Sequence, residues 1–220
     1  MQIAIDGPGG AGKSTLSKLL AKKLGFVYID TGAMYRAAGL ACLRQNVVIR
    51  EETDKAVSVV EGTEIDLTVS EEGQRIFLNG EDVTGLIRTP EVSMAASDVS
   101  AIPAVRLRLV ALQRQLASTR DVIMDGRDIG TYVLPDAPIK IFLTASSDER
   151  ARRRFIELKE RGENCTFEAV LAELEERDKN DSTRAFAPLK PAEDSIIVDT
   201  TELNFEESLA RLYDIIQERL

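Results

Sequence analysis

The sequence predicts an α/β fold with three layers, in which helices pack on a mostly parallel five-stranded sheet. Three observations predict it. Short apolar runs alternate with amphipathic stretches, no repeat or long linker interrupts this pattern, and 220 residues suffice for one domain with an insertion. Strands that alternate with helices pair in parallel through crossover connections. We therefore expect a single domain over residues 1–220.

Five short apolar runs, each bounded by polar or glycine-containing segments, are expected to form the sheet. They cover residues 2–5, 26–29, 121–125, 139–144 and 196–200. Apolar residues at helical spacing, with capping signals, predict the helices. These cover residues 14–24, 33–44, 91–101, 104–118, a stretch after Ser146, 166–179 and a stretch after Asn204. Glu149 and Glu207 follow the two capping residues by three positions, which predicts a capping box at each helix.

Residues 62–89 depart from the alternation and predict a small β-rich insertion. Residues 64–69 and 74–79 are both β-prone, and Glu71-Glu72-Gly73 between them is typical of a turn. We expect a hairpin here.

Composition excludes several classes of function. Lys and Arg number 28 against 37 Asp and Glu, so the net charge is −9, which argues against a nucleic acid partner. An anionic small ligand is still compatible, because it feels the local field of its cleft. The chain has no His, which excludes a His general base and any His-ligated metal site.

The chain carries no signal for export or membrane insertion. Its first residues, MQIAIDGPGG, lack a basic stretch followed by an apolar run, and no apolar run approaches the ~20 residues that span a bilayer. Cys42 and Cys165 are the only cysteines and form no disulfide framework, which favours a reducing compartment. We expect a cytoplasmic protein with no membrane partner. We also expect a monomer, since the sequence shows no exposed apolar stripe that would indicate an oligomer.

A phosphate-binding motif follows the first predicted strand and opens the first predicted helix. It matches G-x-x-x-x-G-K-[ST] in full. Its residues are Gly7, Pro8, Gly9, Gly10, Ala11, Gly12, Lys13 and Ser14, with Thr15 next in the helix. The glycines let backbone N–H groups converge on an anion, Lys13 would reach the β- and γ-phosphates, and Ser14 would offer its hydroxyl to Mg²⁺. The motif predicts a P-loop NTPase-type fold that binds a nucleoside triphosphate, the alternative being a glycine-rich turn without a ligand.

Motifs for other uses of a triphosphate are missing. The guanine-binding pattern Asn-Lys-x-Asp is absent, the nearest string being Asp178-Lys179-Asn180-Asp181. The strand over 121–125 ends in Asp125 and Gly126, without the Glu that positions water in many P-loop hydrolases. Asp125 could cap a turn or reach Mg²⁺ through water. These absences favour phosphoryl transfer to a second substrate.

Arginine is concentrated in polar parts of the chain. One cluster lies on the helix after Ser146, and other arginines lie beside polar or glycine-containing segments. The cluster comprises Arg150, Arg152, Arg153, Arg154 and Arg161, and the others are Arg36, Arg106, Arg127, Arg177 and Arg184. Guanidinium groups bind phosphates bidentately and stabilise charge on a transferring phosphoryl group. The alternative for the cluster is a solvated helix face, with arginines paired to Glu157, Glu160 or Glu163.

Four strings together resemble the bacterial cytidylate kinases from end to end. They are IAIDGPGGAGKST, IDTGAMYR at 29–36, MDGRDIGTYVLPDAPIKIFLTAS at 124–146 and RDKNDSTRAFAPL at 177–189. The Asp-Gly-Arg-Asp-x-Gly-Thr part discriminates best, since adenylate kinases carry a different string there. The resemblance implies ATP-dependent phosphorylation of CMP and dCMP to CDP and dCDP in pyrimidine metabolism, with Mg²⁺. It also implies a monophosphate-binding part that includes the 62–89 insertion, and a short Arg-rich lid over about 150–162.

The resemblance also implies roles for single residues. Asp128, Ser97 and Arg106 would bind the cytosine base. The phosphate of the acceptor would be bound by Arg36, Arg127 and Arg184. Asp181 would bind the ribose, and Asp30 and Thr31 would lie near the acceptor. Arg177 would reach the transferring phosphate and Arg153 would belong to the lid, so the catalytic set is Lys13, Arg127, Arg153, Arg177 and Arg184.

Without the family, these residues have plainer interpretations. Ser97 and Arg106 would be ordinary residues of a helix, with Arg106 a surface charge. Asp128 could simply pair with Arg127, and Asp181 and Arg184 would lie in a polar turn before Pro188. Two other functions stay open on the residues alone. One is a P-loop kinase for another nucleoside monophosphate or an alcohol such as shikimate, and the other is a non-catalytic nucleotide-dependent binding module.

Overall fold

The computed structural model describes residues 1–70 and 73–220, so Glu71 and Glu72 of the predicted turn lie outside the described residues. The chain forms two compact units. The first consists of Met1–Phe26 and Val122–Leu220, and the second of Val27–Asp121. The single domain expected over residues 1–220 stays a prediction.

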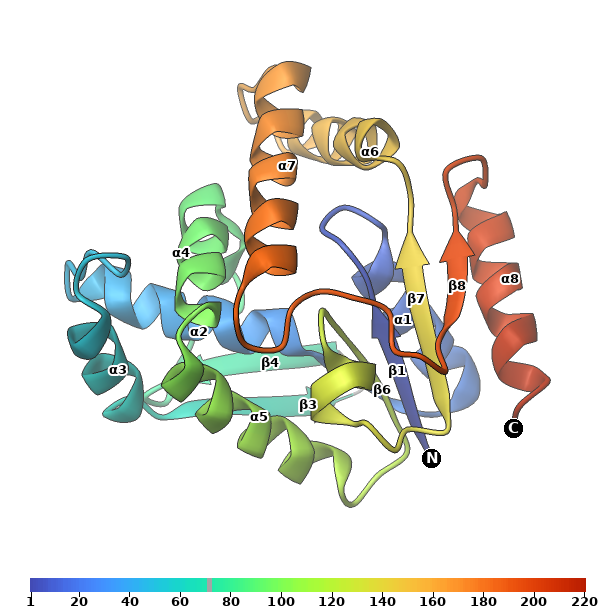
Figure 1. The fold of residues 1–220 in the computed structure, drawn as a ribbon, viewed down its shortest axis with the longest axis horizontal. Helices are drawn as coiled ribbons and strands as arrows, with labels where there is room; N and C mark the ends of the chain where they lie inside the picture. Colours follow the sequence, from blue (N-terminus) through green and yellow to red (C-terminus); the bar gives the residue numbers. More distant parts are fainter. Residues whose placement is uncertain (71–72) are drawn as a thin grey trace. The chain divides into compact units, whose positions relative to one another are not determined.

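Five strands form one sheet in the order β2-β6-β1-β7-β8. They are β1 (Gln2–Asp6), β2 (Val27–Asp30), β6 (Val122–Gly126), β7 (Ile139–Thr144) and β8 (Ile196–Asp199). β1 pairs in parallel with β6 and β7, and β7 pairs in parallel with β8, as the arrowheads of β7 and β8 indicate in Figure 1. All of β6 is buried, as expected for an inner strand of a parallel sheet. The predicted mostly parallel five-stranded sheet is confirmed.

The first unit carries four of the helices. They are α1 (Lys13–Leu24), α6 (Ser147–Glu160), α7 (Phe167–Thr183) and α8 (Phe205–Gln217), with a π-helical turn η2 (Ile129–Val133) after β6. α1 ends where predicted, at Gly25, which takes the left-handed conformation with φ +70°. α6 and α7, adjacent in Figure 1, share a small apolar core that includes Leu158 and Leu174.

The two predicted capping boxes have different outcomes. At α8 the box is confirmed, because Asn204 and Glu207 exchange both side-chain-to-backbone hydrogen bonds. At α6 only half of it forms. The Ser146 hydroxyl accepts from the Glu149 N–H, but the Ser146 N–H donates to Thr201 Oγ1 across 2.9 Å. The Glu149 carboxylate is therefore left to pair with Arg153.

α7 runs past the predicted end at residue 179 to Thr183. The Ser182 and Thr183 hydroxyls, which could end a helix, instead donate to carbonyl oxygens one turn back. Asp181 therefore lies in the last helical turn, and its placement in a polar turn was wrong. Arg184 follows directly as the residue that ends the helix.

The second unit combines helices with a small antiparallel sheet. Its helices are α2 (Thr31–Arg44), α3 (Thr53–Glu61), α4 (Pro90–Ser100) and α5 (Pro103–Ala117), with a 3₁₀ turn η1 (Leu86–Arg88). Its sheet is β3 (Ile65–Ser70), β4 (Gly73–Leu78) and β5 (Glu81–Asp82). The antiparallel register of β3 and β4, with Ile65 opposite Leu78, confirms the predicted hairpin. α2 and α4 pack closely at Gly39, because glycine has no Cβ. A Cβ there would lie only 2.9 Å from the backbone of Ala95.

Both cysteines are reduced thiols in the structure. Cys42 lies in the apolar core of the second unit, and burial raises its pKa to about 11, which makes it unreactive. Within the described residues, no helix has both the length and the apolar character to cross a membrane.

Candidate active site

The phosphate loop, residues 7–12, joins β1 to α1. Gly7 and Gly10 adopt φ of +148° and +74°, which favour glycine. A Cβ at Gly7 would lie 1.9 Å from the backbone oxygen of Leu143, and one at Gly10 would lie 3.1 Å from Arg150 Cβ. Glycine therefore lets the loop pack against the end of β7 and against α6. The amino end of α1 follows the loop directly, as an anion site requires.

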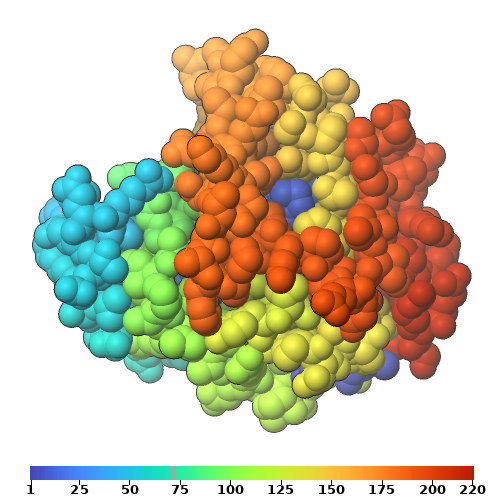
Figure 2. Space-filling model, in the orientation of Figure 1, coloured from blue at the N-terminus to red at the C-terminus, as the bar shows by residue number. Residues whose placement is uncertain are grey.

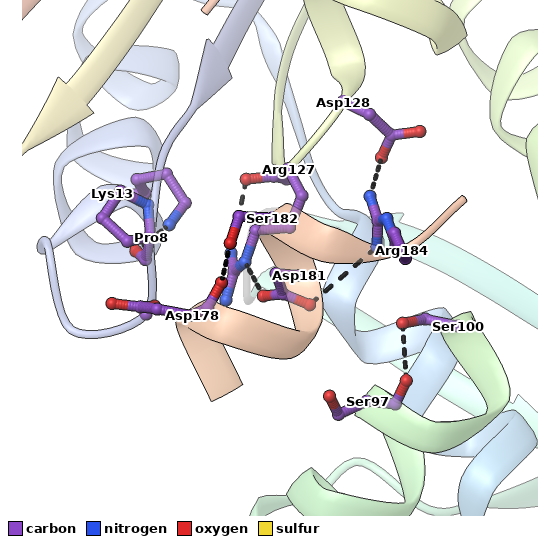
Figure 3. Close-up of polar contacts among 12 residues, drawn as sticks. Pro8, Lys13, Ser97, Ser100, Arg127, Asp128, Asp178, Asp181, Ser182 and Arg184 are labelled. Carbon is purple, nitrogen blue, oxygen red and sulfur yellow. Dashed lines mark hydrogen bonds and ion pairs between the residues drawn. The ribbon is translucent and has the colours of Figure 1, made fainter. Parts of the chain in front are cut away.

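Lys13 begins α1 and folds back over the loop. Its ammonium Nζ donates to the Pro8 carbonyl oxygen across 2.7 Å (Figure 3), and the residue is buried. Burial holds the pKa of Lys13 well below its usual range. The positive charge of Arg127 lowers it further, while the carboxylates of Asp125 and Asp6 oppose the shift. A phosphate bound at the loop would favour the charged form of Lys13.

Ser14 and Asp125 bring two oxygen groups together at the start of α1. The Ser14 hydroxyl donates to Asp125 Oδ2 across 2.8 Å. Asp125 reaches this position because β6 pairs with β1 in a register that places it opposite Ile5, next to the strand end that carries the loop. In the same motif Ala11 is buried and Thr15 is exposed.

Arg127 and Asp181 form a buried ion pair. Arg127 Nε lies 2.7 Å from Asp181 Oδ2 (Figure 3). Burial opposes ionisation of Asp181, but the positive charges of Arg127, Arg177 and Arg184 outweigh it and hold its pKa below the usual range. Burial likewise opposes the charge on Arg127, and the Asp181 carboxylate outweighs it and raises the pKa of Arg127. The interpretation of Asp128 as the partner of Arg127 is thereby replaced, since Asp181 takes that place.

Asp128 faces Arg184 instead. Arg184 Nη2 lies 3.4 Å from Asp128 Oδ1, and Nη1 lies 3.9 Å from Asp181 Oδ1 (Figure 3). Arg184 Nε donates to the Ala187 carbonyl oxygen across 2.6 Å. Two arginines and two acids from the 124–131 and 177–189 strings thus form one network, and their roles toward a substrate stay a prediction.

This network borders the phosphate loop. A Cβ at Gly9 would lie 3.7 Å from Arg127 Nη2 and 3.3 Å from Leu174 Cδ2. Arg177 adds a positive charge that lowers the pKa of Lys13. In Figure 2, blue atoms of the N-terminal segment are visible in a hollow bordered by orange atoms of α7 and by yellow atoms. Lys13, Arg127 and Arg177 therefore concentrate positive charge at the loop, where a triphosphate would lie.

Arg150 is a buried arginine that the site prediction missed. Its Nη1 donates to the Gly9 carbonyl oxygen across 2.9 Å and lies 2.6 Å from Asp178 Oδ2. Its Nε donates to the Ala145 carbonyl oxygen. Arg150 therefore ties α6 and α7 to the phosphate loop. The Arg-rich cluster was visible in the sequence, but no local signal separated Arg150 from its neighbours.

The other arginines of the cluster pair with acids of α6, and Arg153 also binds Thr200. Arg153 Nε lies 3.0 Å from Glu149 Oε1, and Arg153 Nη2 donates to the Thr200 carbonyl oxygen. Arg154 and Arg161 both pair with Glu157, as the alternative interpretation of the cluster expected. Arg153 thus lies at Thr200, whereas Arg150 contacts the loop. The lid role of Arg153 stays a prediction.

Within the second unit, Asp30 is the centre of a polar cluster at the start of α2. Its Oδ1 accepts from the Ala33 N–H, its Oδ2 lies 2.9 Å from Arg88 Nη2, and Arg36 Nη1 lies 3.9 Å away. Burial opposes ionisation of Asp30, but Arg36 and Arg88 outweigh it and hold its pKa below the usual range. Buried Thr31 begins the helix beside this cluster.

The β-rich insertion contributes two members of this cluster that the sequence did not identify. Gln74 of β4 accepts a hydrogen bond from the Asp30 N–H through Oε1 across 2.7 Å, and Arg88 of η1 supplies the ion pair. The only available signal was their place in residues 62–89, which the resemblance assigned to the monophosphate-binding part.

Ser97 and Arg106 lie near one another in the second unit. Arg106 is only 1% exposed, so its interpretation as a surface charge was wrong. Its Nη1 donates to the Ser100 carbonyl oxygen across 3.1 Å, and its guanidinium carbon lies 5.4 Å from the centre of the Tyr35 ring. The Ser100 hydroxyl donates to the Ser97 carbonyl oxygen (Figure 3). The buried Ser97 hydroxyl has no hydrogen-bond partner among residues 1–70 and 73–220.

Known proteins similar to this chain match it along its whole length. A family model described as "Cytidylate kinase" matches residues 3–218. A cytidylate kinase from Caldicellulosiruptor saccharolyticus is 55% identical over 98% of this chain and 95% of its own. One from Carboxydothermus hydrogenoformans is 52% identical over 98% of this chain and 97% of its own, and one from Geobacillus sp. is 51% identical over 100% and 98%.

A solved structure supports the fold alone. An uncharacterised protein from Eubacterium ventriosum covers 100% of this chain and 99% of its own at a TM-score of 0.52 and 15% identity. The family itself rests on the match over residues 3–218 and on relatives that are more than half identical along the chain. The chain belongs to the cytidylate kinase family.

Proposed function

We propose that this protein transfers the γ-phosphoryl group of ATP to CMP and dCMP, giving CDP and dCDP in pyrimidine nucleotide metabolism. One observation carries the proposal furthest. Arg127 lies at the phosphate loop beside Gly9 and pairs with Asp181, and the next residue, Asp128, lies against Arg184. A loop suited to donor phosphates is thus adjacent to two arginines and to Asp128, the carboxylate that would read the base. This arrangement suits a phosphoryl acceptor that is itself a nucleotide.

The donor site would be residues 7–15. The backbone N–H groups of the loop and the amino end of α1 favour an anion there. Lys13 lies against the loop through Pro8 and would exchange that carbonyl for the β- and γ-phosphates.

Ser14 and Asp125 suit Mg²⁺ at the donor phosphates. A hydroxyl and a carboxylate 2.8 Å apart offer the hard oxygen ligands that Mg²⁺ prefers. No cluster of three or more acidic, Cys or His side chains that could cage a metal occurs in the described chain. Mg²⁺ usually keeps waters and substrate phosphates as further ligands. When bound, Mg²⁺ would neutralise charge between the β- and γ-phosphates, with Ser14 and Asp125 holding it.

The acceptor would be held by the residues for which the sequence resemblance implies CMP binding. The Asp128 carboxylate would accept from the cytosine N4 amino group, and it would lose this partner with uracil, which has a carbonyl there. Ser97 and Arg106 would bind the acceptor atoms of the base, with Asp30 and Thr31 near it. Arg36, Arg127 and Arg184 would bind the phosphate and Asp181 the ribose.

The chemical step is an in-line displacement. An acceptor phosphate oxygen forms a bond to the γ-phosphorus while the bond from that phosphorus to the β,γ-bridging oxygen breaks, and ADP leaves with the electron pair. No general base is required, which accords with a chain without His. Lys13, Arg127, Arg177 and Arg184 would stabilise the charge on the transferring group, and Arg153 would act in a lid that excludes water.

We also propose that the protein acts in the cytoplasm as a monomer. A net charge of −9 disfavours a nucleic acid partner, and a sequence with only two cysteines and no disulfide framework favours a reducing compartment.

Coupled ADP release tests the function directly. The purified chain would be given ATP and Mg²⁺ with CMP, dCMP, UMP, AMP, shikimate or no acceptor, and products would be identified by chromatography. We expect fast release with CMP and dCMP, formation of CDP and dCDP, and clearly slower release with every other addition. Equal release without an acceptor would instead indicate a hydrolase, and release only with shikimate would indicate an alcohol kinase.

A further inference from the structure

Asp6 is a buried acid that has no part in the proposed chemistry. It is the last residue of β1, directly before Gly7 of the phosphate loop, and is 3% exposed. Its Oδ1 accepts from the Ile129 N–H across 2.7 Å, and its Oδ2 accepts from the Gly130 N–H across 2.7 Å. Both donors belong to the first turn of η2, where backbone N–H groups have no partner within the turn. Each carboxylate oxygen thus satisfies one backbone group.

Lys140 packs against the same turn beside Asp6. A Cβ at Gly130 would lie 3.1 Å from Lys140 Cδ and 3.4 Å from Asp6 Oδ2, so Gly130 lies close to both side chains. Lys140 is itself fixed by an ion pair with Asp194 and a hydrogen bond to the Pro135 carbonyl oxygen. The start of η2 therefore has little freedom to shift while the Asp6 carboxylate accepts both hydrogen bonds.

Arg127 and Asp128 lie between two attachments to this one residue. The backbone of Asp6 is paired with Gly126, directly before Arg127. The side chain of Asp6 binds Ile129 and Gly130, directly after Asp128. The two residues assigned to the acceptor are thus bracketed by the residue from which the phosphate loop begins.

We propose that Asp6 is a positioning residue, whose carboxylate holds Arg127 and Asp128 in place beside the phosphate loop so that the acceptor binds in line with the donor. A carboxylate is required because two N–H donors face it. Asn would offer one acceptor oxygen and would turn an NH₂ group toward the second donor. Burial raises the pKa of Asp6 to about 7 although the two backbone hydrogen bonds lower it. The fold therefore keeps an acid at a position where burial disfavours its charge.

The test compares Asp6→Asn with Asp199→Asn, a matched control. Asp199 is also the last residue of a strand and also accepts a backbone N–H, that of Thr201, but it is exposed and distant in sequence from the loop. CMP and ATP affinities would be measured separately by calorimetry at about pH 8, where Asp6 is ionised, together with kcat for CMP and UMP. We expect Asp6→Asn to weaken CMP binding at least about tenfold, to change ATP binding less than about twofold, and to reduce the CMP preference over UMP. Asp199→Asn should match the wild type.

Several outcomes would overturn this role. Equal losses of CMP and ATP affinity would make Asp6 merely structural, and unchanged CMP affinity would deny it any role. If Asp6→Asn does not fold, Gly130→Ala provides the measurement, because its methyl group would press the same turn against Lys140 and Asp6. It should also weaken CMP binding more than ATP binding, and no such difference would refute the proposal. The inference rests on the proposed function. Failure of the wild type to bind CMP would refute that function, whereas wild-type CMP binding with an unaltered variant would refute only the role of Asp6.

Discussion

Arg127 and Asp181 meet across 2.7 Å, although 54 residues separate them in the sequence, and both charges are largely shielded from water. The pair ties the segment after β6 to the last turn of α7. Removing Asp181 takes away the carboxylate that most strongly stabilises the buried charge of Arg127, which costs far more than the net value of the intact pair.

Asp181→Asn should therefore destabilise the fold. We expect the free energy of unfolding to fall by roughly 3 kcal/mol, since Arg127 loses its charged partner within a buried site. Urea denaturation near neutral pH measures this. Asp82→Asn is the control, because Asp82 and Arg75 form an exposed pair at 3.6 Å, and it should leave the unfolding midpoint unchanged. Equal effects of the two substitutions would mean that the Arg127 pair contributes no more than a surface contact.

Asp128→Asn should reduce discrimination between pyrimidines. The amide can turn its NH₂ group toward the uracil O4, so the penalty that a carboxylate imposes on UMP is relieved. We expect the ratio of kcat/KM for CMP over UMP to fall about tenfold or more. Asp136→Asn, an exposed acid eight residues along the chain, should keep the wild-type ratio. A ratio that does not change in Asp128→Asn would exclude Asp128 from reading the base.

Lys13→Met should fold normally and lose most of its turnover. Met fills a similar volume in the buried space under the loop but has no charge for the transferring phosphoryl group. We expect kcat for CMP to fall about 100-fold or more, with the thermal unfolding midpoint close to the wild type. Lys22→Met, in the exposed last turn of the same helix, is the control. Full activity in Lys13→Met would remove Lys13 from the mechanism.

Short-range sequence patterns predicted most of the fold. The apolar spacing of residues 14–24 with Gly25 predicted α1, and the β-prone runs at 64–69 and 74–79 predicted the hairpin, because these patterns depend on neighbours in the sequence. The phosphate loop was predictable for the same reason, since all of its residues are contiguous. Each of these features is set by short-range geometry.

Features that depend on contacts between residues far apart in the sequence could not be predicted from it. Arg150 differs from the other arginines of α6 because its partners include Asp178 of α7 and the carbonyl oxygen of Gly9, which is 141 residues away. Glu149 fails to close the α6 capping box because Thr201 binds the Ser146 N–H. The buried position of Arg106 depends on packing of α5 within the second unit. The polar cluster around Asp30 likewise depends on residues distant in sequence, because its partners Gln74 and Arg88 come from the insertion.

Asp6 makes the stability of the chain depend on pH with a definite sign. Because burial raises its pKa from 3.8 to about 7, the folded chain holds a proton between these values that the unfolded chain has released. The contribution of Asp6 to stability is therefore fully present below about pH 4 and is lost as the pH rises to about 7. Urea unfolding would be compared between the wild type and Asp6→Asn, which cannot titrate at this position. Lys13 and Asp128, whose charges act on Asp6, are present in both proteins. Between about pH 5 and about pH 8, the wild type should lose roughly 2–3 kcal/mol relative to the variant, since one pKa unit is worth about 1.4 kcal/mol. A difference that stays constant across this range would mean that the two backbone hydrogen bonds keep Asp6 ionised throughout.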